Sequence, residues 1–519
     1  MGRAFRLRPR TLADLLATLD GEHTVRGDDA TPVTGISHDS RNLQPGELFV
    51  ALPGFHVDGH AFIAGAVARG ASVVVAQTPP PVPLAVPLVL VSSTRTALAD
   101  LAAAFYDHPS RQLPVIGVTG TDGKTSTAQL VSAILEARGM RTGWLSTINT
   151  KIGAEVRPNT SSHTTPEAPA VQETLAEMVD ARVAVAVLEV SSHALALDRV
   201  RGTQFRVGVF TNLSPEHLNF HETVEAYAGA KAALFAGLPP DGVAVLNADD
   251  PHSEAMRAAT RATVTTYSLQ RPADIWASDI ALSAHGTTFT VHDAQPTGND
   301  AASVTLTTRL IGEFNVANWL AAYGAARVFG ATLDDLRRAV ELQTPIPGRM
   351  WLVQEGQPFL AVVDFAHTPQ GLAHALDTLR RIVPGKILLA FGLPGGRDYA
   401  NRIEMGQLAA ERTDYFVITI DDAYGDDPEA IANHIAAGAQ AAGAVRGEGF
   451  DINLDRRAAI RAVLRRAQAG DAVIVPGHGH IESLDTGSQT VPWNDATVVA
   501  EELRALGYRV GDARDTAIL

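Results

Sequence analysis

The segment VIGVTGTDGKTSTAQL, residues 115–130, runs from an apolar stretch through a turn between two glycines into a Lys-Thr pair. Such a turn could bind the phosphates of a nucleotide, because glycines let backbone N–H groups approach an anion, Lys124 adds a positive charge and the Thr125 hydroxyl can bind magnesium. The usual GxxxxGK[ST] spacing is not met, since Val118 stands where the first glycine is expected. The competing interpretation is an ordinary strand-to-helix turn with a surface lysine. The residues predicted to form this phosphate-binding turn are Gly120, Thr121, Asp122, Gly123, Lys124 and Thr125.

Two further groups of polar residues also follow apolar runs. Glu189 closes one run, in LEVSSHALALDR, where an ionised carboxylate is costly unless it faces a cation or hydrogen-bond donors. In FTNLSPEHLNFHETVEAYAGAKAALF, His217 and His221 lie among acidic residues, and Lys231 follows among Ala, Leu and Phe. Imidazole and carboxylate groups could hold a second divalent cation, an arrangement that suits phosphoryl transfer. The alternatives are a strand-end Glu189 in water and a Lys231 whose stem packs on apolar neighbours at the surface.

Strands and helices in alternation must position these groups. From residue 115 onward, apolar strand-like runs alternate with helical segments, which predicts a parallel sheet covered on both faces. A β-rich piece at 287–310 precedes helices at 315–342, and a second α/β series begins after TPIPGRM. Residues 30–105 alternate short strands with Ala-rich helical stretches. Ligands bind at the carboxyl ends of strands in parallel sheets, and each polar group follows such an end.

Composition and charge narrow the classes of function. The 519 residues are enough for several domains, and 46% hydrophobic with 19% charged residues is typical of a globular protein. A formal charge of -15 means that the chain has no overall positive charge to attract a polyanion, so we expect no nucleic-acid partner. The absence of Cys excludes thiolate metal sites and cysteine nucleophiles. No apolar run approaches the length of a membrane helix and no export signal is visible, so we expect a cytoplasmic protein without a membrane partner.

The order of the motifs resembles that of a known family. TGTDGKT, LEVSSH, FTNLSPEHLNFH with YAGAKAALF, GEFNVANWLAA, IPGRM, VVDFAHTP and DRRAAI are similar, in this order, to motifs of the ATP-dependent Mur ligases of peptidoglycan synthesis. Near the start, GISHDSRNLQPGELFVALPGFHVDGHAF resembles their UDP-MurNAc domain. The resemblance runs from about residue 33 to about residue 480 and is greatest to the UDP-N-acetylmuramoyl-tripeptide synthetases, which add the third residue of the stem peptide. The phosphate loop of this family is built around TGTxGKT, which explains the unusual spacing.

The resemblance implies a fold and a reaction. It implies three α/β domains: an N-terminal UDP-MurNAc-binding domain at 1–110, a central P-loop ATPase-like parallel-sheet domain at 111–347, and a C-terminal Rossmann-like amino-acid-binding domain at 348–519. The cofactors would be ATP and Mg²⁺. The D-Glu γ-carboxylate of UDP-MurNAc-L-Ala-D-Glu would attack the ATP γ-phosphate, and an amino acid would displace phosphate from the acyl phosphate to form an amide. We expect a monomer.

The resemblance also assigns roles to residues, motif by motif. Further ATP contacts would be Asn315, Arg349 and Asp364. The metal ligands would be Thr125, Glu189, His217 and a carbamylated Lys231, because carbamylation turns a cation into a carboxylate suited to magnesium. The catalytic residues would be Lys124, Glu189, His217 and Lys231. The contacts to the UDP-MurNAc-peptide would be Ser40, Phe55, His56, Val57, Thr164, Thr165, Ser191 and Arg199.

The sequence departs from the family pattern where the amino acid is expected to bind. Family members that add meso-diaminopimelate carry DNPR, whose arginine binds the distant carboxylate, and here Tyr424 in DDAYGDDP stands in its place. The family's GKGHE reads GHGHI, with His478 for Lys and Ile481 for Glu. Both changes argue against a substrate with a second carboxylate, so we expect L-lysine or L-ornithine. The amino-acid contacts would be Arg397, Asp421, Asp422, Tyr424, Gly477 and Ile481, with Arg397 on the α-carboxylate.

Two other functions are weighed against this one. A divergent relative could join another amino acid to another carboxylate, as folylpolyglutamate and cyanophycin synthetases do, but the N-terminal HDSR and LPG motifs resemble a UDP-MurNAc domain. A nucleotide-binding regulatory protein would not need the whole set of predicted metal ligands. His163 and Leu197, near the expected UDP-sugar contacts, also differ from the family pattern.

Overall fold

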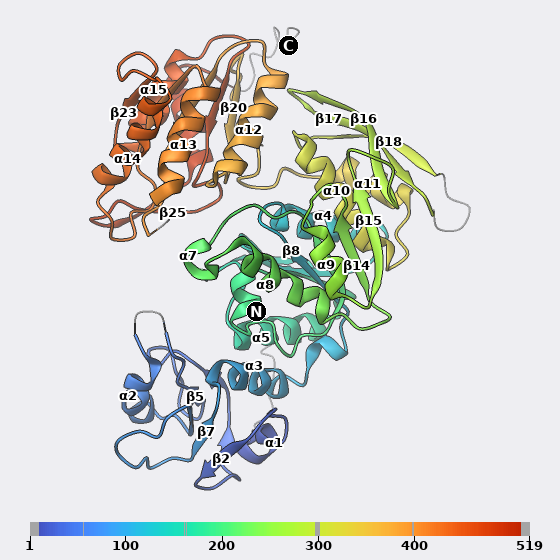
Figure 1. Cartoon of the computed structure of the whole chain (residues 1–519), viewed down its shortest axis with the longest axis vertical. Helices are drawn as coiled ribbons and strands as arrows, with labels where there is room; N and C mark the ends of the chain where they lie inside the picture. Colours follow the sequence, from blue (N-terminus) through green and yellow to red (C-terminus); the bar gives the residue numbers. More distant parts are fainter. Residues whose placement is uncertain are drawn as a thin grey trace. The chain divides into compact units, whose positions relative to one another are not determined.

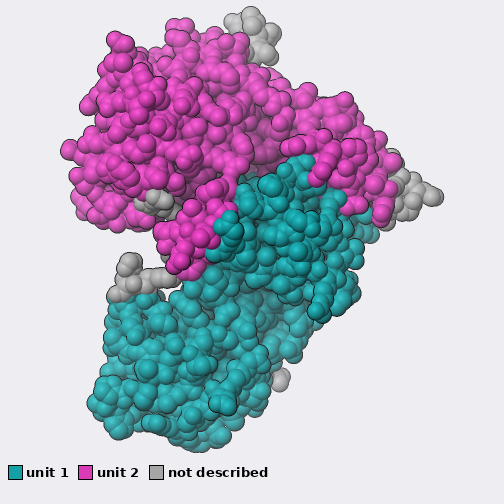
Figure 2. All heavy atoms as spheres, in the orientation of Figure 1, with its two compact units in different colours: residues 1–213, 225–266, 321–331 teal, residues 214–224, 267–320, 332–519 magenta. Residues whose placement is uncertain are grey.

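The computed structural model describes residues 10–54, 57–159, 161, 163–295, 302–396 and 399–509 (Figure 1). The predicted contacts Phe55, His56 and Arg397 lie outside the described residues. The chain forms two compact units, coloured separately in Figure 2. Unit 1 comprises Met1–Leu213, Glu225–Thr266 and Ala321–Ala331, and unit 2 comprises Ser214–Val224, Tyr267–Leu320 and Thr332–Leu519.

The first part of unit 1 is a small sheet with helices on it. Its five strands lie in the order β2 (His23–Arg26), β7 (Leu88–Val91), β6 (Val73–Ala76), β5 (Leu48–Val50) and β4 (Ile36–Ser37). Val-rich strands pair in parallel from β4 to β7, and β2 pairs antiparallel at the edge. Helix α3 (Thr94–Phe105) buries its apolar residues against one face together with α1 (Leu12–Leu16), and α2 (Ile63–Ala68) covers the other. The helical stretches predicted in this region are confirmed.

The second part of unit 1 holds a larger sheet. Its strands lie in the order β11 (Glu155–Pro158), β10 (Asn149–Ile152), β9 (Thr142–Leu145), β12 (Val185–Glu189), β8 (Val115–Thr119), β13 (Phe205–Phe210), β14 (Val243–Asn247) and β15 (Thr263–Ser268). The central strands from β9 to β14 are parallel and fully buried along β8 and β12, as the continuous apolar runs predict. The helices of this part are α4 (Lys124–Ala137), α5 (Ala168–Asp180), α6 (Ser192–Ala196), α8 (Val224–Ala236) and α9 (Ser253–Ala259).

Unit 2 contains a run of three antiparallel strands and a six-stranded sheet. The first consists of β16 (Ile275–Ser283), β17 (Gly286–Asp293) and β18 (Ser303–Thr308), followed by α10 (Glu313–Arg327) and α11 (Leu333–Leu342). The second has the order β19 (Trp351–Leu352), β20 (Leu360–Val363), β24 (Ala472–Val475), β21 (Ile387–Phe391), β22 (Tyr415–Ile418) and β23 (Phe450–Ile452). From β20 to β23 its strands are parallel, which confirms the predicted second α/β series.

Helices cover both faces of this six-stranded sheet. One face packs on α12 (Pro369–Ile382), α13 (Tyr399–Arg412) and α14 (Pro428–Ala441), which stand in a row in Figure 1. The other face packs on α15 (Arg456–Arg466) and α16 (Asp495–Ala505). The carboxyl ends of β24, β21 and β22 therefore meet at one edge, where their loops carry the predicted amino-acid contacts. Among the described helices, none has the length and hydropathy to span a bilayer.

Candidate active site

The phosphate loop of unit 1 lies between β8 and α4 and is held from the end of β13. Gly120 has φ +151°, and a Cβ there would lie 1.9 Å from Thr211 Oγ1, so a larger residue does not fit. The Asn212 side chain accepts the N–H of Asp122 at 2.9 Å, and the Thr211 hydroxyl donates to the Asp122 carbonyl at 2.6 Å. Gly123, with φ +82°, precedes the first residue of α4. The loop is thus a preformed turn at a helix N-terminus, the position at which phosphates bind.

Two lysines donate to the same carbonyl oxygen of this loop. Lys124 Nζ lies 3.0 Å from the Gly120 oxygen and 2.7 Å from the Thr121 oxygen. Lys231 Nζ, on α8, lies 2.7 Å from the same Gly120 oxygen and 4.3 Å from the centre of the Tyr227 ring. Lys231 is 1% exposed, so it is a buried lysine and not the surface lysine of the alternative interpretation. Two ammonium groups on one carbonyl oxygen place two positive charges close together at the phosphate loop.

Glu189 closes β12 next to β8, where it pairs in register with Val118. It is fully buried, and its carboxylate accepts the backbone N–H of Thr147 at 2.9 Å and the Thr147 hydroxyl at 3.0 Å. The alternative interpretation, in which Glu189 is a strand-end residue in water, is therefore wrong. Both donors are neutral, so a buried negative charge stands at the same sheet edge as the phosphate loop, where a cation would stabilise it. The Glu189 carboxylate and the Thr125 hydroxyl are oxygen donors of the kind that magnesium prefers, and their binding of magnesium stays a prediction.

The predicted UDP-sugar contacts of unit 1 partly share one network. Thr165 donates its hydroxyl to the Glu189 carbonyl at 2.8 Å and accepts the N–H of Ser191 at 3.1 Å. Thr164 Oγ1 lies 3.2 Å from Thr147 Oγ1 and acts as the donor in this contact, because Thr147 gives its own hydrogen to Glu189. The site expected for the sugar nucleotide is therefore continuous with the backbone that carries Glu189.

Arg199 extends this network. It is 6% exposed, its Nη1 donates to the Thr165 carbonyl at 3.2 Å, and its Nε lies 2.9 Å from Glu167 Oε1. Ser40 is half-buried in the first part of unit 1, and Val57 is 57% exposed. No hydrogen bond of the described residues ties Ser40 or Val57 to the Thr165 network.

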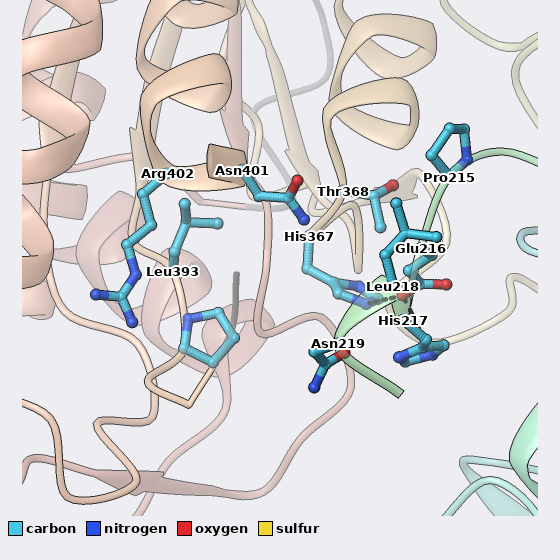
Figure 3. Close-up of a pocket in the computed structure, with 11 residues that line it drawn as sticks. Pro215, Glu216, His217, Leu218, Asn219, His367, Thr368, Leu393, Asn401 and Arg402 are labelled. Atoms are coloured by element: carbon cyan, nitrogen blue, oxygen red, sulfur yellow. Dashed lines mark ion pairs between the residues drawn. The ribbon is translucent and has the colours of Figure 1, made fainter. Parts of the chain in front are cut away.

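In unit 2, His217 lines a pocket formed by the 215–219 segment, the start of α12, the loop after β21 and the start of α13 (Figure 3). The Glu216 carboxylate lies 3.6 Å from His217 Nε2 and 3.5 Å from His367 Nε2. Arg402, on the opposite wall, pairs with Asp426 at 2.6 Å. The pocket thus combines imidazoles, a carboxylate and a guanidinium, and its wall at α13 lies next to the predicted amino-acid loops.

The other predicted ATP contacts also belong to unit 2. Asn315 is buried and donates its side-chain amide to the Ile311 carbonyl at 2.9 Å. Asp364 accepts the N–H of Met350 at 2.6 Å and that of Ala366 at 2.8 Å. The Arg349 guanidinium lies 4.6 Å from the centre of the Phe365 ring. Each of these residues is held by contacts within unit 2, and their contact with ATP stays a prediction.

Asp421 and His478 form a buried pair at the carboxyl ends of β22 and β24. His478 is 0% exposed; its Nδ1 lies 3.0 Å from Asp421 Oδ1 and its Nε2 lies 2.6 Å from the Ser483 carbonyl oxygen. Both partners are acceptors, so both ring nitrogens must donate and the ring is an imidazolium. Burial alone would lower the pKa of His478, but the hydrogen bond and the charge of Asp421 raise it above the usual value. Gly477 leaves room for this pair, since its Cβ would lie 2.8 Å from Asp421 Oδ2.

Asp422 is tied to a neighbouring loop in the same way. Its carboxylate accepts the N–H of Asp485 at 2.7 Å and the Tyr424 hydroxyl at 3.1 Å, and Tyr424 donates its own N–H to Asp485 at 3.1 Å. Tyr424 is 61% exposed and has φ +44°. Ile481 is half-buried in the same loop region. The structure therefore brings five of the six predicted amino-acid contacts to one edge, and Arg397 lies outside the described residues.

Several residues that contact the site residues lie outside any recognisable sequence motif. Thr147 holds Glu189 from a turn between two strands, and Asp485 braces the 421–424 segment from a short hairpin far along the chain. His367 belongs to VVDFAHTP, but only its distance to Glu216 shows a site role. Arg402 follows GGRD closely, which is a signal that a search around that motif could have found.

Comparisons with known proteins match nearly the whole chain. Models of Mur ligase domains match three segments: the Mur ligase family catalytic domain at residues 32–106, the middle domain at 118–326 and the glutamate ligase domain at 348–479. A UDP-N-acetylmuramyl-tripeptide synthetase of Roseiflexus sp. is 42% identical over 92% of this chain and 95% of its own. A UDP-N-acetylmuramoyl-L-alanyl-D-glutamate 2,6-diaminopimelate ligase of Gloeobacter violaceus is 40% identical over 91% of this chain and 94% of its own.

Solved structures show the same architecture. The structure of a UDP-N-acetylmuramoyl-L-alanyl-D-glutamate 2,6-diaminopimelate ligase aligns with a TM-score of 0.64 and 30% identity over 96% of this chain and 99% of its own. MurF from Acinetobacter baumannii, at 23% identity and a TM-score of 0.66 over 91% of this chain and 96% of its own, shares the fold. The three matched segments follow the order of the three predicted domains.

Proposed function

Since this chain belongs to the Mur ligase family and is an ATP-dependent ligase, we propose that it joins an amino acid to the D-Glu γ-carboxylate of UDP-MurNAc-L-Ala-D-Glu. The observation that carries the proposal is the array at one sheet edge of unit 1: a preformed phosphate loop, the buried carboxylate of Glu189 and the buried Lys231 on the Gly120 carbonyl. A binding module would need the loop alone. The buried carboxylate and second lysine support a transfer of phosphate.

The reaction has two steps. The substrate carboxylate attacks the γ-phosphorus of ATP, its bond to ADP breaks, and an acyl phosphate forms. The amine of the amino acid then attacks the acyl carbon, a tetrahedral intermediate expels phosphate, and the amine loses a proton as the amide forms. Lys124 and the N–H groups at the start of α4 bind and orient the transferred phosphate and balance its charge. Magnesium, when bound by Thr125, Glu189 and Lys231, would neutralise further charge; the part of His217 in this set stays a prediction.

We also propose that Lys231 carries a carbamate. The ammonium group first loses a proton, and addition of carbon dioxide to the neutral Nζ releases a second one, so that one of the two positive charges at the Gly120 carbonyl is replaced by a negative one. The change removes the repulsion between Lys124 and Lys231 and supplies an oxygen ligand for magnesium. A carbamate signal in the ¹³C NMR spectrum of protein equilibrated with labelled bicarbonate, absent in Lys231→Ala, is the expected result; equal spectra would disprove it.

For the amino acid, the proposal is L-lysine or L-ornithine. Asp421, Asp422 and Asp485 lie at one edge with the His478 cation, while Arg402 is paired with Asp426, so the edge has an excess of negative charge. Such a surface favours a side-chain ammonium over a second carboxylate. Several relatives are named diaminopimelate ligases, which makes diaminopimelate the alternative to be tested directly.

The deciding experiment is an amino-acid panel. Purified protein, ATP, magnesium and UDP-MurNAc-L-Ala-D-Glu are combined with each standard amino acid, ornithine or meso-diaminopimelate, and released phosphate is measured. We expect release to depend on lysine or ornithine. Release that depends on diaminopimelate would disprove the amino-acid proposal alone, and release with none of them would disprove the ligase proposal. A Lys124→Ala control reports phosphate from contaminating enzymes.

A further inference from the structure

Arg95 stands at the start of α3, where the small N-terminal sheet of unit 1 adjoins the network of Thr165 and Arg199. Helix α3 begins after Ser93, whose hydroxyl accepts the N–H of Thr96 at 3.2 Å. The Arg95 side chain is 19% exposed, so it is mostly enclosed but reachable from solvent. Its Nη2 lies 3.5 Å from the carbonyl oxygen of Pro53, in the LPG segment just before the predicted UDP-sugar contacts.

A single carboxylate is shared by two guanidinium groups. Glu167 Oε1 lies 2.9 Å from Arg199 Nε and 3.7 Å from Arg95 Nη1. Two positive charges against one negative charge leave a net positive charge in a largely buried place, which is costly unless an anion binds there. Two other carboxylates of this region are already engaged: Asp39 is paired with Arg41 at 2.9 Å, and Asp198 accepts the hydroxyl of Thr96 at 2.9 Å.

Each guanidinium group also has an N–H donor that is not used in a hydrogen bond. Among the described residues, neither Arg95 Nη1 nor Arg199 Nε has a hydrogen-bond partner of good geometry, although both atoms are buried. The Nε–H of Arg199 is close to Glu167 but is not aligned with it. Arg199 is nine-tenths buried, so the unpaired donor is not satisfied by bulk water. An excess of charge and an excess of donors at the same point are what an anionic ligand requires.

We propose that Arg95, with Arg199, binds the diphosphate of the UDP-sugar. This inference rests on the proposed substrate. A diphosphate suits the place because its oxygens can accept from both guanidinium groups, and Arg95 itself stands in the first turn of α3, the positive end of that helix. Arg95 reaches the LPG segment on one side and Arg199 reaches Thr165 on the other, so the pair joins the two groups of predicted UDP-sugar contacts.

The test is a binding measurement on Arg95→Ala with three ligands. Isothermal titration calorimetry with UDP, uridine and UDP-MurNAc-L-Ala-D-Glu is compared between wild type and variant. We expect the Kd for UDP to rise by about 10-fold to 100-fold, the range for loss of hydrogen bonds to a charged group, while uridine binding stays the same. Arg95→Lys keeps the positive charge but loses the planar guanidinium group that can donate two parallel hydrogen bonds, so its Kd for UDP should lie between those of wild type and Arg95→Ala. Arg69→Ala, an exposed arginine at the end of α2, is the control and should change the Kd by less than about twofold.

Other outcomes distinguish a failure of the Arg95 proposal from a failure of the proposed substrate. If Arg95→Ala leaves the UDP affinity unchanged but weakens UDP-MurNAc-L-Ala-D-Glu, Arg95 binds a carboxylate of the peptide and the proposal is wrong. If UDP and uridine weaken equally, or if Arg95→Lys shows a lowered Tm together with the same loss, the role of Arg95 is structural. If the wild type binds UDP-MurNAc-L-Ala-D-Glu but not UDP, the assignment of Arg95 to the diphosphate is wrong and the proposed function stands. If the wild type binds neither ligand, the proposed substrate fails as well, and the amino-acid panel should then release no phosphate.

Discussion

His478 is a buried residue whose protonation is fixed by its neighbours. Its two nitrogens face the Asp421 carboxylate and the Ser483 carbonyl, both acceptors. Arg456 and Asp495 lie near enough to act on it by charge, and their effects on the pKa of His478 are opposite. The net effect is a raised pKa, so protonated His478 stabilises the folded state. Because the folded pKa is above the unfolded value, this contribution is complete below about pH 6.5 and is lost as the pH rises through the folded pKa.

The predicted consequence is a stability difference that depends on pH. His478→Gln should be less stable than wild type at pH 6, and the gap in the free energy of unfolding should shrink as the pH is raised to 9. Urea denaturation at four pH values between 6 and 9 measures it. His285→Gln, which changes an exposed histidine of unit 2, should follow wild type throughout. A gap that is constant, or that grows with pH, would show that the ring is not an imidazolium in the folded protein.

At the scale of elements, the phosphate loop depends on the spacing between two neighbouring segments. The backbone of 120–122 passes so close to Thr211 that only a residue without a Cβ fits at Gly120. Gly120→Ala should therefore displace the loop and weaken ATP binding by at least about 10-fold, because the N–H groups no longer face the phosphates. Gly229→Ala, in the exposed part of α8 where an added Cβ meets nothing within 4 Å, should keep the affinity and be as stable as wild type or more so. Fluorescence titration with a labelled ATP analogue measures both, and equal affinities would contradict the predicted loop.

Elements of this kind could be predicted from the sequence because their signals are local. An apolar run, a glycine turn and a helical segment follow one another at 115–137, and the structure confirms the strand, the turn and the helix. The bonds between elements could not be predicted. Thr147 reaches Glu189 because β9 and β12 are neighbours, and Arg95 reaches Glu167 because α3 packs near α5, facts of topology that leave no pattern in either segment. The motif resemblance located the predicted site residues, but the bonds that hold them became visible only in three dimensions.

At the scale of the whole molecule, two compact units predict two unfolding transitions. Arg456 and Asp495 form an ion pair in unit 2 with both side chains 0% exposed, and removal of one partner of such a pair costs about 3–5 kcal/mol. Calorimetry of Arg456→Ala should show one transition lowered by several degrees and the other unchanged, whereas UDP should raise only the unchanged one. Arg465→Ala, an exposed change on the same helix, is the control. A single transition that responds to both treatments would show that the units unfold together.

The hydrogen bonds of Asp421 with His478 and of Asp422 with the backbone of Asp485 limit how this enzyme can change during evolution. The carboxylates proposed to select the amino acid also hold the loop after β22 to the loops after β24. A substitution that admits a different amino acid therefore also removes bonds that keep this edge of the sheet together. We expect new specificities to arise only in backgrounds that carry spare stability from substitutions elsewhere in unit 2, so that the order in which mutations are acquired matters as much as their identity.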